Sequence, residues 1–143
     1  MSDVGDTAMA RARAFIAAFN AQDHAALAET LNYPHMRLAN GTFQTIPSLE
    51  AFIEGSRRGR AGLEAEGWDH TVAASVEVVH EGPDKVHLAI TNDRCRPDGS
   101  VYNRFETLWI VTLQEGHWGV QFRSSYLRSV ADASVSSGGS GPR

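Results

Sequence analysis

Cysteine is nearly absent from this chain, and its scarcity limits both the fold and the chemistry. Cys95 is the one cysteine among 143 residues, so no intrachain disulfide can form. A lone thiol with no catalytic motif around it is usually a small, inert side chain, and it suits a reducing compartment. We therefore expect a cytoplasmic location and a fold that depends on its hydrophobic core.

Long apolar runs and blocks of charge are missing too. No run approaches the roughly 18 residues that span a bilayer, and the N-terminal segment lacks the pattern of a signal peptide. The net charge of -4 argues against a phosphate-binding surface. The one basic cluster, Arg57, Arg58 and Arg60, is expected to be a solvated helix face, with Glu54 paired to Arg58. We expect neither a nucleic-acid partner nor a membrane partner.

The hydrophobic content that is present fits one domain. With 42% hydrophobic residues, a chain of 143 residues can build one core but not two. Residues 132–143 are rich in Ser and Gly and have little to bury. The expected organisation is a domain over residues 1–131 and a disordered tail over residues 132–143.

Three segments have the apolar spacing of helices. The first covers residues 4–20. A second begins with Asp23 as its N-cap and ends at Tyr33-Pro34, because the residue before proline disfavours helical geometry. Ser48 is expected to cap a third helix that runs to Leu63 and is weakened by three glycines.

Strand-like sequence surrounds and follows the third helix. Two short strands, at residues 35–39 and 42–46, flank Asn40-Gly41, which is the strongest two-residue hairpin signal. From Trp68 the apolar period changes to two, and turn sequences divide the remainder. The result is an antiparallel meander of four long strands, at residues 68–81, 85–96, 102–113 and 117–128.

This order of elements resembles the nuclear-transport-factor-2-like (NTF2-like) superfamily, which includes ketosteroid isomerases, scytalone dehydratase and SnoaL-like cyclases. The resemblance lies in residues 15–23, in the Asn40-Gly41 hairpin and in residues 108–118. It implies a cystatin-like α+β cone, in which three N-terminal helices pack on a strongly curved, six-stranded, mixed but mainly antiparallel sheet. Such folds host unrelated activities, so function must be argued from the site.

The isomerases of this group resemble one another in a base carboxylate on the first strand and an acid pair deeper in the cone. Here the first strand contains no Asp or Glu, and the position of the deeper acid falls near Trp109. Steroid-type proton transfer is therefore not supported.

A pocket is expected where the apolar stripes of the four long strands turn polar at the same end of the sheet. An apolar cleft with a few convergent polar groups is the usual form of a small-molecule site. His70 is the expected proton-transfer group, because imidazole titrates near neutral pH. Arg94 is suited to a carboxylate, phenolate or enolate. The expected ligand-binding residues are Tyr33, His35, Trp68, Asn92, Arg94, Asn103, Phe105, Glu106, Trp109, Ser124 and Tyr126.

Each of these residues also has a purely structural interpretation, since strand ends turn polar wherever they meet solvent. The face of the strand at residues 102–113 is ambiguous as well. Glu106 becomes the acid or base if its face lines the cone, and it otherwise lies on the outer face. The remaining histidines have no ligand spacing, so neither a metal nor a cofactor is expected.

Two functions stay open at this point. The first is a small-molecule binding cone for an apolar, ring-containing ligand, either as a binder or as an acid-base isomerase, dehydratase or cyclase. The second is a non-catalytic dimeric module. The resemblance implies a homodimer in either case, formed through an outer sheet face with Thr71, Ala73, Ser75, Glu77, His87, Ala89 and Thr91.

Overall fold

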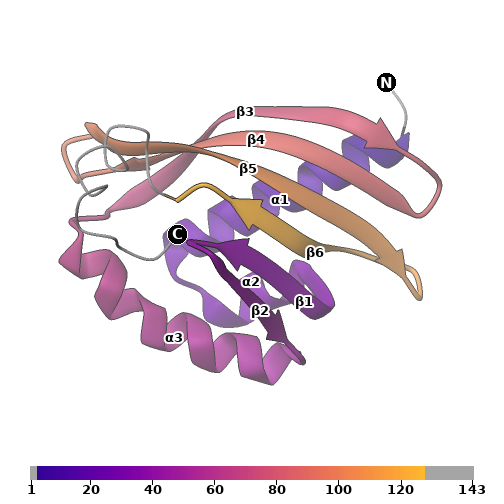
Figure 1. Ribbon diagram of the computed structural model, residues 1–143, viewed down its shortest axis with the longest axis horizontal. Coiled ribbons are helices and arrows are strands. Elements are labelled where there is room, and N and C mark those ends of the chain that lie inside the picture. The colour runs from indigo at the N-terminus through magenta and orange to yellow at the C-terminus, as the bar shows by residue number, and fades with distance from the viewer. Residues whose placement is uncertain (1–2, 128–143) are drawn as a thin grey trace.

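The computed structural model describes residues 3–127, which form helices first and a sheet around them (Figure 1). The elements are α1 (Asp3–Ala21), α2 (His24–Glu29), β1 (Leu31–Ala39), β2 (Thr42–Ile46), α3 (Leu49–Ala65), β3 (His70–Glu81), β4 (Lys85–Cys95), β5 (Val101–Gln114) and β6 (His117–Ser125). The predicted tail at residues 132–143 lies outside the described residues. Within residues 3–127, no helix combines the length and the apolar character needed to cross a membrane.

The six strands form one curved sheet in the order β2-β1-β6-β5-β4-β3. Among the strands of residues 3–127, β1 and β6 pair in parallel and the other neighbours are antiparallel. The helices lie on the concave side of the sheet (Figure 1). This arrangement confirms the predicted α+β cone with a mixed, mainly antiparallel sheet.

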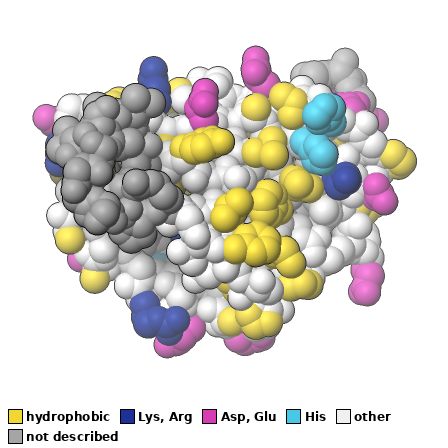
Figure 2. Space-filling view, in the orientation of Figure 1, with side chains coloured by type: hydrophobic (Ala, Val, Ile, Leu, Met, Phe, Trp, Pro, Cys, Tyr) yellow, Lys and Arg dark blue, Asp and Glu magenta, His cyan; other side chains and the backbone are white. Residues whose placement is uncertain are grey.

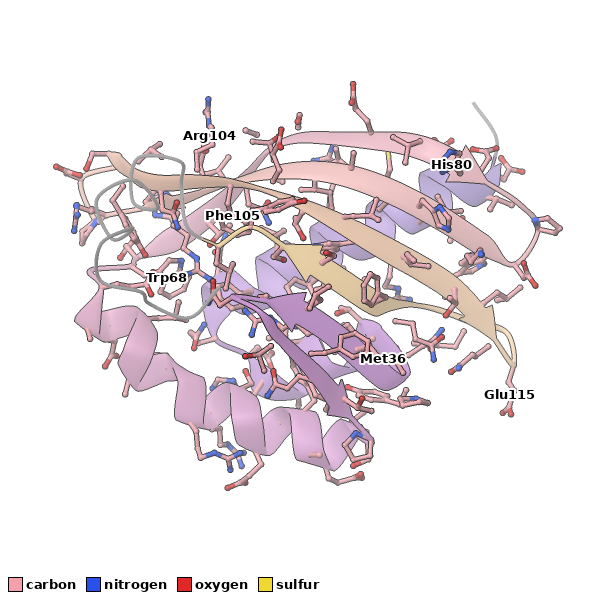
Figure 3. All side chains as sticks on the ribbon, in the orientation of Figure 1. Met36, Trp68, His80, Arg104, Phe105 and Glu115 are labelled. Carbon is pink, nitrogen blue, oxygen red and sulfur yellow. The ribbon has the colours of Figure 1, made fainter. Side chains whose placement is uncertain are left out.

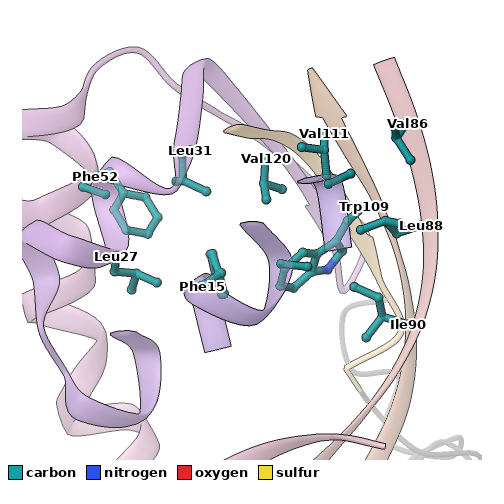
Figure 4. Packing of buried hydrophobic residues seen from close by; sticks show 13 residues of the cluster. Phe15, Leu27, Leu31, Phe52, Val86, Leu88, Ile90, Trp109, Val111 and Val120 are labelled. Carbon is teal, nitrogen blue, oxygen red and sulfur yellow. The ribbon is translucent and has the colours of Figure 1, made fainter. Parts of the chain in front are cut away.

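The hydrophobic core fills the space between α1, α2 and the middle of the sheet (Figure 4). Phe15 of α1 meets the edge of Trp109 of β5, with ring centroids 4.7 Å apart. Val86, Val111 and Val120 are fully buried on three adjacent strands. This packing holds α1 against the concave face of the sheet, and Phe15 and Trp109 also border the space that is left beside it.

Local signals in the sequence set the helix starts and the first hairpin. The Asp23 carboxylate accepts a hydrogen bond from the Ala26 amide at 3.1 Å, and the Ser48 hydroxyl accepts one from the Ala51 amide at 3.2 Å. Both are N-caps, which stabilise a helix by satisfying free amides of its first turn. Asn40 and Gly41 both have positive φ angles, 54° and 75°, as a tight hairpin turn requires.

The predicted end of the second helix is wrong by several residues. That helix ends at Glu29, and β1 already begins at Leu31 instead of at His35. The reason is tertiary: the Val120 amide donates to the Thr30 carbonyl at 2.9 Å, and Leu31 pairs with Val120 of β6. Partners from β6 thus replace the helical hydrogen bonds that the local sequence would otherwise make.

Candidate functional site

A cavity of about 480 Å³ lies between the concave face of the sheet and the helices α1 and α3. Its apolar wall includes four phenylalanines and a tryptophan: Phe15, Phe19, Phe52, Phe105 and Trp109. Cavities of this size enclose small organic molecules.

The face of α3 that borders the cavity leaves room for it. Phe52, Ser56, Gly59 and Leu63 recur at helical spacing and all line the cavity. A Cβ atom added at Gly59 would meet no atom within 4 Å. Two of the three glycines that weaken this helix, Gly55 and Gly59, therefore also keep its inner face open.

Two arginines lie side by side on the floor of the cavity. Arg37 of β1 is the register partner of Arg123 of β6, and both line the cavity. On the other side of Arg123, β5 places Trp109 in register with it. We call Arg37 and Arg123 the arginine pair.

Arg123 is held by one phenylalanine ring and one histidine. Its guanidinium carbon lies 5.0 Å from the centroid of the Phe15 ring. Its Nε donates to His35 Nε2 at 3.0 Å, while His35 Nδ1 donates to the Val120 carbonyl at 2.9 Å. The carbonyl can only accept, so the proton of the neutral ring sits on Nδ1 and Nε2 is free to accept.

Burial and neighbouring cations set the charge states of these groups. Burial, with Arg123 as the next cause, lowers the pKa of His35 to about 3, so the ring is neutral at physiological pH. Burial, then Arg37 and Arg94, lowers the pKa of Arg123 to about 9, which still leaves the guanidinium charged at pH 7. Burial and Arg94 lower the pKa of Arg37 as well.

A third arginine, Arg94, lines the cavity near the end of β4, where β3 and β5 begin. Arg94 makes a 2.9 Å ion pair with Glu66, just beyond α3, and its guanidinium carbon lies 5.4 Å from the Phe105 ring centroid. The Tyr102 hydroxyl also donates to Glu66. Burial and the Glu66 carboxylate raise the pKa of Tyr102, so the phenol stays protonated. Arg94 is thus partly neutralised, unlike the arginine pair.

Asn92 supplies a polar group that has no protein partner. Asn92 is 4% exposed and lines the cavity, yet its Oδ1 atom makes no hydrogen bond with any of residues 3–127. Buried polar atoms are nearly always paired, so an unpaired one bordering a cavity indicates a missing partner such as a ligand.

The described lining contains none of the residue types that usually act as a general acid or base. Within residues 3–127, the cavity is bordered by no Asp, Glu, His, Tyr, Lys or Cys side chain. Arg37, Arg58, Arg94 and Arg123 are its ionisable groups.

Four of the predicted ligand-binding residues line the cavity. The structure brings together Asn92, Arg94, Phe105 and Trp109. Figure 3 shows Phe105 and its neighbour Arg104 on different sides of β5, as alternation along a strand requires. The ambiguous face is thereby decided: Phe105, Thr107, Trp109 and Val111 are buried, and Glu106 is exposed on the outer side.

His70 does not line the cavity. Its Nδ1 atom lies 2.9 Å from the neighbouring Asp69 carboxylate at the start of β3. The register of β3 against β4 shifts between Ala73 and Ser75, which moves Thr71 to the cavity side and leaves Val72 exposed. Thr71 and Ala73 therefore do not belong to the outer face, contrary to the prediction. A β-bulge inverts the alternation of side chains, and nothing in the local sequence marks it.

The same kind of shift displaces Ser124 and Tyr126. The register of β6 against β5 changes between Ile110 and Val111, so Val120 faces inward and is followed inward by Arg123 and Ser125. Ser124 lies opposite Leu108 on the outer face, and Tyr126 is 72% exposed. Ser125 and Leu127 take their places in the lining.

The other predicted residues lie beside the cavity without bordering it. Tyr33 donates its hydroxyl to the Ala28 carbonyl at 2.8 Å, and the Trp68 indole donates to Thr71 Oγ1 at 2.9 Å. Asn103 donates to the Leu127 carbonyl. His35 is buried behind Arg123 and acts on the cavity only through it.

The arginine pair was missed by sequence reasoning. Arg37 had a detectable signal, because it alternates with His35 and Ala39 on a strand whose inner face is otherwise buried. Arg123 had none, since strict alternation along β6 puts it on the outer face.

Comparison with known proteins agrees with the cystatin-like α+β fold described above. The model of a family described as NTF2-like protein (DUF6841) matches residues 9–123. A search of curated proteins gave no significant match.

Solved structures share the fold at low sequence identity. An NTF2-like protein of unknown function from Shewanella oneidensis is 14% identical, with a TM-score of 0.67 over 85% of this chain and 97% of its own. A ketosteroid isomerase-like protein from Erwinia carotovora atroseptica is 16% identical, with a TM-score of 0.68 over 90% and 99%. A domain of unknown function with a cystatin-like fold from Nostoc punctiforme is 11% identical, with a TM-score of 0.68 over 94% and 84%. At these identities the likeness concerns the fold, and the chain belongs to the NTF2-like family DUF6841.

Proposed function

We propose that this protein binds a small, ring-containing molecule in the cavity between its sheet and α3. The observation that carries the proposal is the aromatic lining of a cavity of about 480 Å³. Apolar walls with a few placed polar groups are the usual form of a small-molecule site. The residues that hold the ligand are the lining aromatics, with Asn92 and the arginines fixing its orientation.

Binding without proton transfer fits the site better than isomerase, dehydratase or cyclase chemistry. General acid-base catalysis needs a group that titrates near the working pH and reaches the substrate. The lining within residues 3–127 offers none among Asp, Glu, His, Tyr, Lys and Cys. His70, the predicted proton carrier, is engaged with Asp69 instead.

The cytoplasmic location stays a prediction, and Cys95, buried and unpaired, supports it.

The test uses the tryptophans as site-specific reporters. Of the three, only Trp109 lines the cavity, and its indole Nε1 donates to Thr107 Oγ1 at 3.0 Å. Naphthalene-2-carboxylate and naphthalene-2-carboxamide, titrated into ¹⁵N-labelled protein, serve as probes. We expect at least one of them to shift the Trp109 indole signal in a saturable way and to leave that of Trp118 in place.

A matched pair of variants checks that the cavity is the binding site. Gly59 borders the cavity and Gly62 does not, and an added Cβ meets nothing within 4 Å at either residue. Gly59→Phe should weaken probe binding by at least about tenfold, because overfilling a packed site costs about 1–3 kcal/mol. Gly62→Phe should leave affinity unchanged. Absence of any Trp109 response up to about 1 mM of both probes, a free energy of about -4 kcal/mol, would refute the proposed function.

A further inference from the structure

We propose that the ligand of this cavity is an organic anion, whose oxyanion is bound between Arg37 and Arg123 while its ring lies against the aromatic wall. This inference rests on the proposed function and narrows it to one chemical class of ligand. The shared chemistry is a carboxylate or an enolate attached to a ring.

The first argument is the absence of a counter-charge. Within residues 3–127, no Asp or Glu oxygen lies within 4.0 Å of a nitrogen of Arg37 or Arg123, whereas Arg11, Arg58, Arg60, Arg94 and Arg104 are all in ion pairs. Arg13, Arg57 and Arg96 also lack an ion pair among the described residues, but they are exposed to solvent. Arg37 and Arg123 are instead partly buried in the cavity lining. Burying an unpaired charge is costly, so such a charge indicates a missing partner.

The second argument is the position of the two charges. As register partners on parallel neighbouring strands, Arg37 and Arg123 present their guanidinium groups to the same side of the sheet. Like charges opposite each other in a sheet are destabilising. An anion between them converts this repulsion into two charge-assisted interactions, and the planar guanidinium matches a carboxylate in geometry.

The third argument is that Arg123 is held in place before any ligand binds. His35 accepts from its Nε at 3.0 Å and Phe15 stacks against its plane, which leaves the terminal nitrogens with no partner in the described residues. Preorganised donors lose little entropy when a ligand binds. His35 is therefore a positioning residue, and its neutral ring is what allows it to accept from a cation.

The net charge of the chain has the opposite sign to the charge of the cavity lining. The net charge is -4, yet every ionisable side chain among residues 3–127 that borders the cavity is an arginine. A cleft lined by one sign of charge concentrates ligands of the opposite sign. Asn92, with its unpaired Oδ1, adds an acceptor for a hydroxyl or amide group elsewhere on the ligand.

The experiment compares two probes of equal shape and different charge. Naphthalene-2-carboxylate should bind at least about tenfold more tightly than naphthalene-2-carboxamide, since hydrogen bonds to charged groups are worth more than neutral ones. Arg37→Gln should remove most of this preference, and Arg37→Lys, which keeps the charge without the planar fork, should retain part of it. Arg60→Gln is the matched control, because Arg60 is exposed and pairs with Glu64.

Stability of the free protein gives an independent measurement. Arg37→Gln removes one of two unpaired like charges, so it should raise the melting temperature of the unliganded protein while it weakens carboxylate binding. Arg123→Gln, read by the same probe ratio, provides a second variant at the other member of the pair.

The outcomes separate this inference from the function on which it rests. Equal affinity for both probes, with the Trp109 signal shifted by each, overturns the anion and leaves the proposed function intact. A carboxylate preference that survives both Arg37→Gln and Arg123→Gln also overturns it. Failure of both probes to bind overturns the proposed function itself.

Discussion

At the level of single residues, the candidate site depends on a neutral histidine, His35, that orients Arg123. His35 is completely buried, and each of its ring nitrogens has one partner, the Val120 carbonyl and Arg123 Nε. Protonation would put a donor at Nε2 facing a guanidinium that can only donate. The orientation of Arg123 therefore requires the neutral ring.

The low pKa of His35 makes stability depend on pH in a defined direction. The folded state has a pKa of about 3, and the unfolded state has the ordinary value of 6.5. Below pH 6.5 the unfolded chain binds a proton that the folded chain refuses, so the free energy of unfolding falls as pH drops from 6.5 towards 3. We expect a loss of about 3 kcal/mol between pH 7 and pH 4 from this group.

Urea unfolding of the protein and of His35→Gln at several pH values measures this loss. The variant should show a shallower decline over the same interval, because glutamine does not titrate. Parallel curves for the two proteins would contradict the assignment. If the variant does not fold, the His35 ring signals in NMR should still show no titration above about pH 4.

At the scale of elements, close contact between β1 and β6 fixes where the inward face begins. Gly119 of β6 lies directly against the backbone of β1 at Leu31 and Asn32. The Asn32 side-chain amide donates to the Thr112 carbonyl of β5 and to the His117 carbonyl of β6 at 2.9 and 3.1 Å, which ties the start of β1 to both strands of the β5–β6 hairpin. This contact, with the bulge that follows it, directs Arg123 rather than Ser124 into the cavity.

Gly119→Ala tests the contact between the two strands. A Cβ at this position would lie 2.6 Å from the Leu31 carbonyl carbon and 2.7 Å from the Asn32 amide nitrogen. Since both are backbone atoms that cannot move aside alone, we expect destabilisation of about 1–3 kcal/mol.

Gly62→Ala is the matched control, to be measured by the same urea unfolding. Its added Cβ meets no atom within 4 Å on the exposed side of α3. The substitution should stabilise the protein by about 0.5–1 kcal/mol, because alanine favours a helix more than glycine does. Equal effects of the two substitutions would show that Gly119 has no steric role.

At the scale of the whole molecule, the outer face of the sheet carries an apolar patch. Figure 2 shows hydrophobic side chains gathered over β1, β5 and β6 on this face. Leu38, Phe43 and Leu108 are exposed by 39%, 59% and 37%, and Phe43 packs on Phe122 with ring centroids 6.4 Å apart. The outer apolar patch consists of Met36, Leu38, Phe43, Leu108, Ile110 and Phe122.

We propose that two copies of the chain pair through the outer apolar patch. Large exposed apolar patches on folded domains mark interaction surfaces. The patch lies nearer β1, β2 and β6 than the predicted interface, which included Ser75, Glu77 and Thr91 on the outer side of β3 and β4. A patch of this kind supports an isologous dimer, in which the same surface serves both subunits.

Sedimentation equilibrium measures this association. We expect a dimer at micromolar concentration, and Leu108→Glu should shift it to monomer by placing a charge in the patch. Val101→Glu changes a side chain that is also exposed, by 49%, but lies outside the patch, so it should leave the dimer intact. A monomer at all concentrations, or dissociation by both variants alike, would exclude this interface.

Short-range signals in the sequence are enough to predict the order of the elements and the class of fold. Asp23, Ser48 and Asn40-Gly41 act through contacts within a few residues, so their effects can be predicted from neighbours alone. The apolar periods identified α1, α3 and the four long strands, and through them the cone. Asn92, Arg94, Phe105 and Trp109 lie on the inner face as predicted, because β4 and β5 keep strict alternation there.

Which side chains meet inside the cone depends on strand pairing that the local sequence does not reveal. The end of α2 depends on pairing with the distant strand β6, and the bulges in β3 and β6 depend on how these strands pair with β4 and β5. Because side chains alternate with a period of two, a shift of one residue exchanges the inner and outer faces. That exchange moved His70, Ser124 and Tyr126 out of the site and brought in Arg123, beside Arg37, as the charged centre of the cavity.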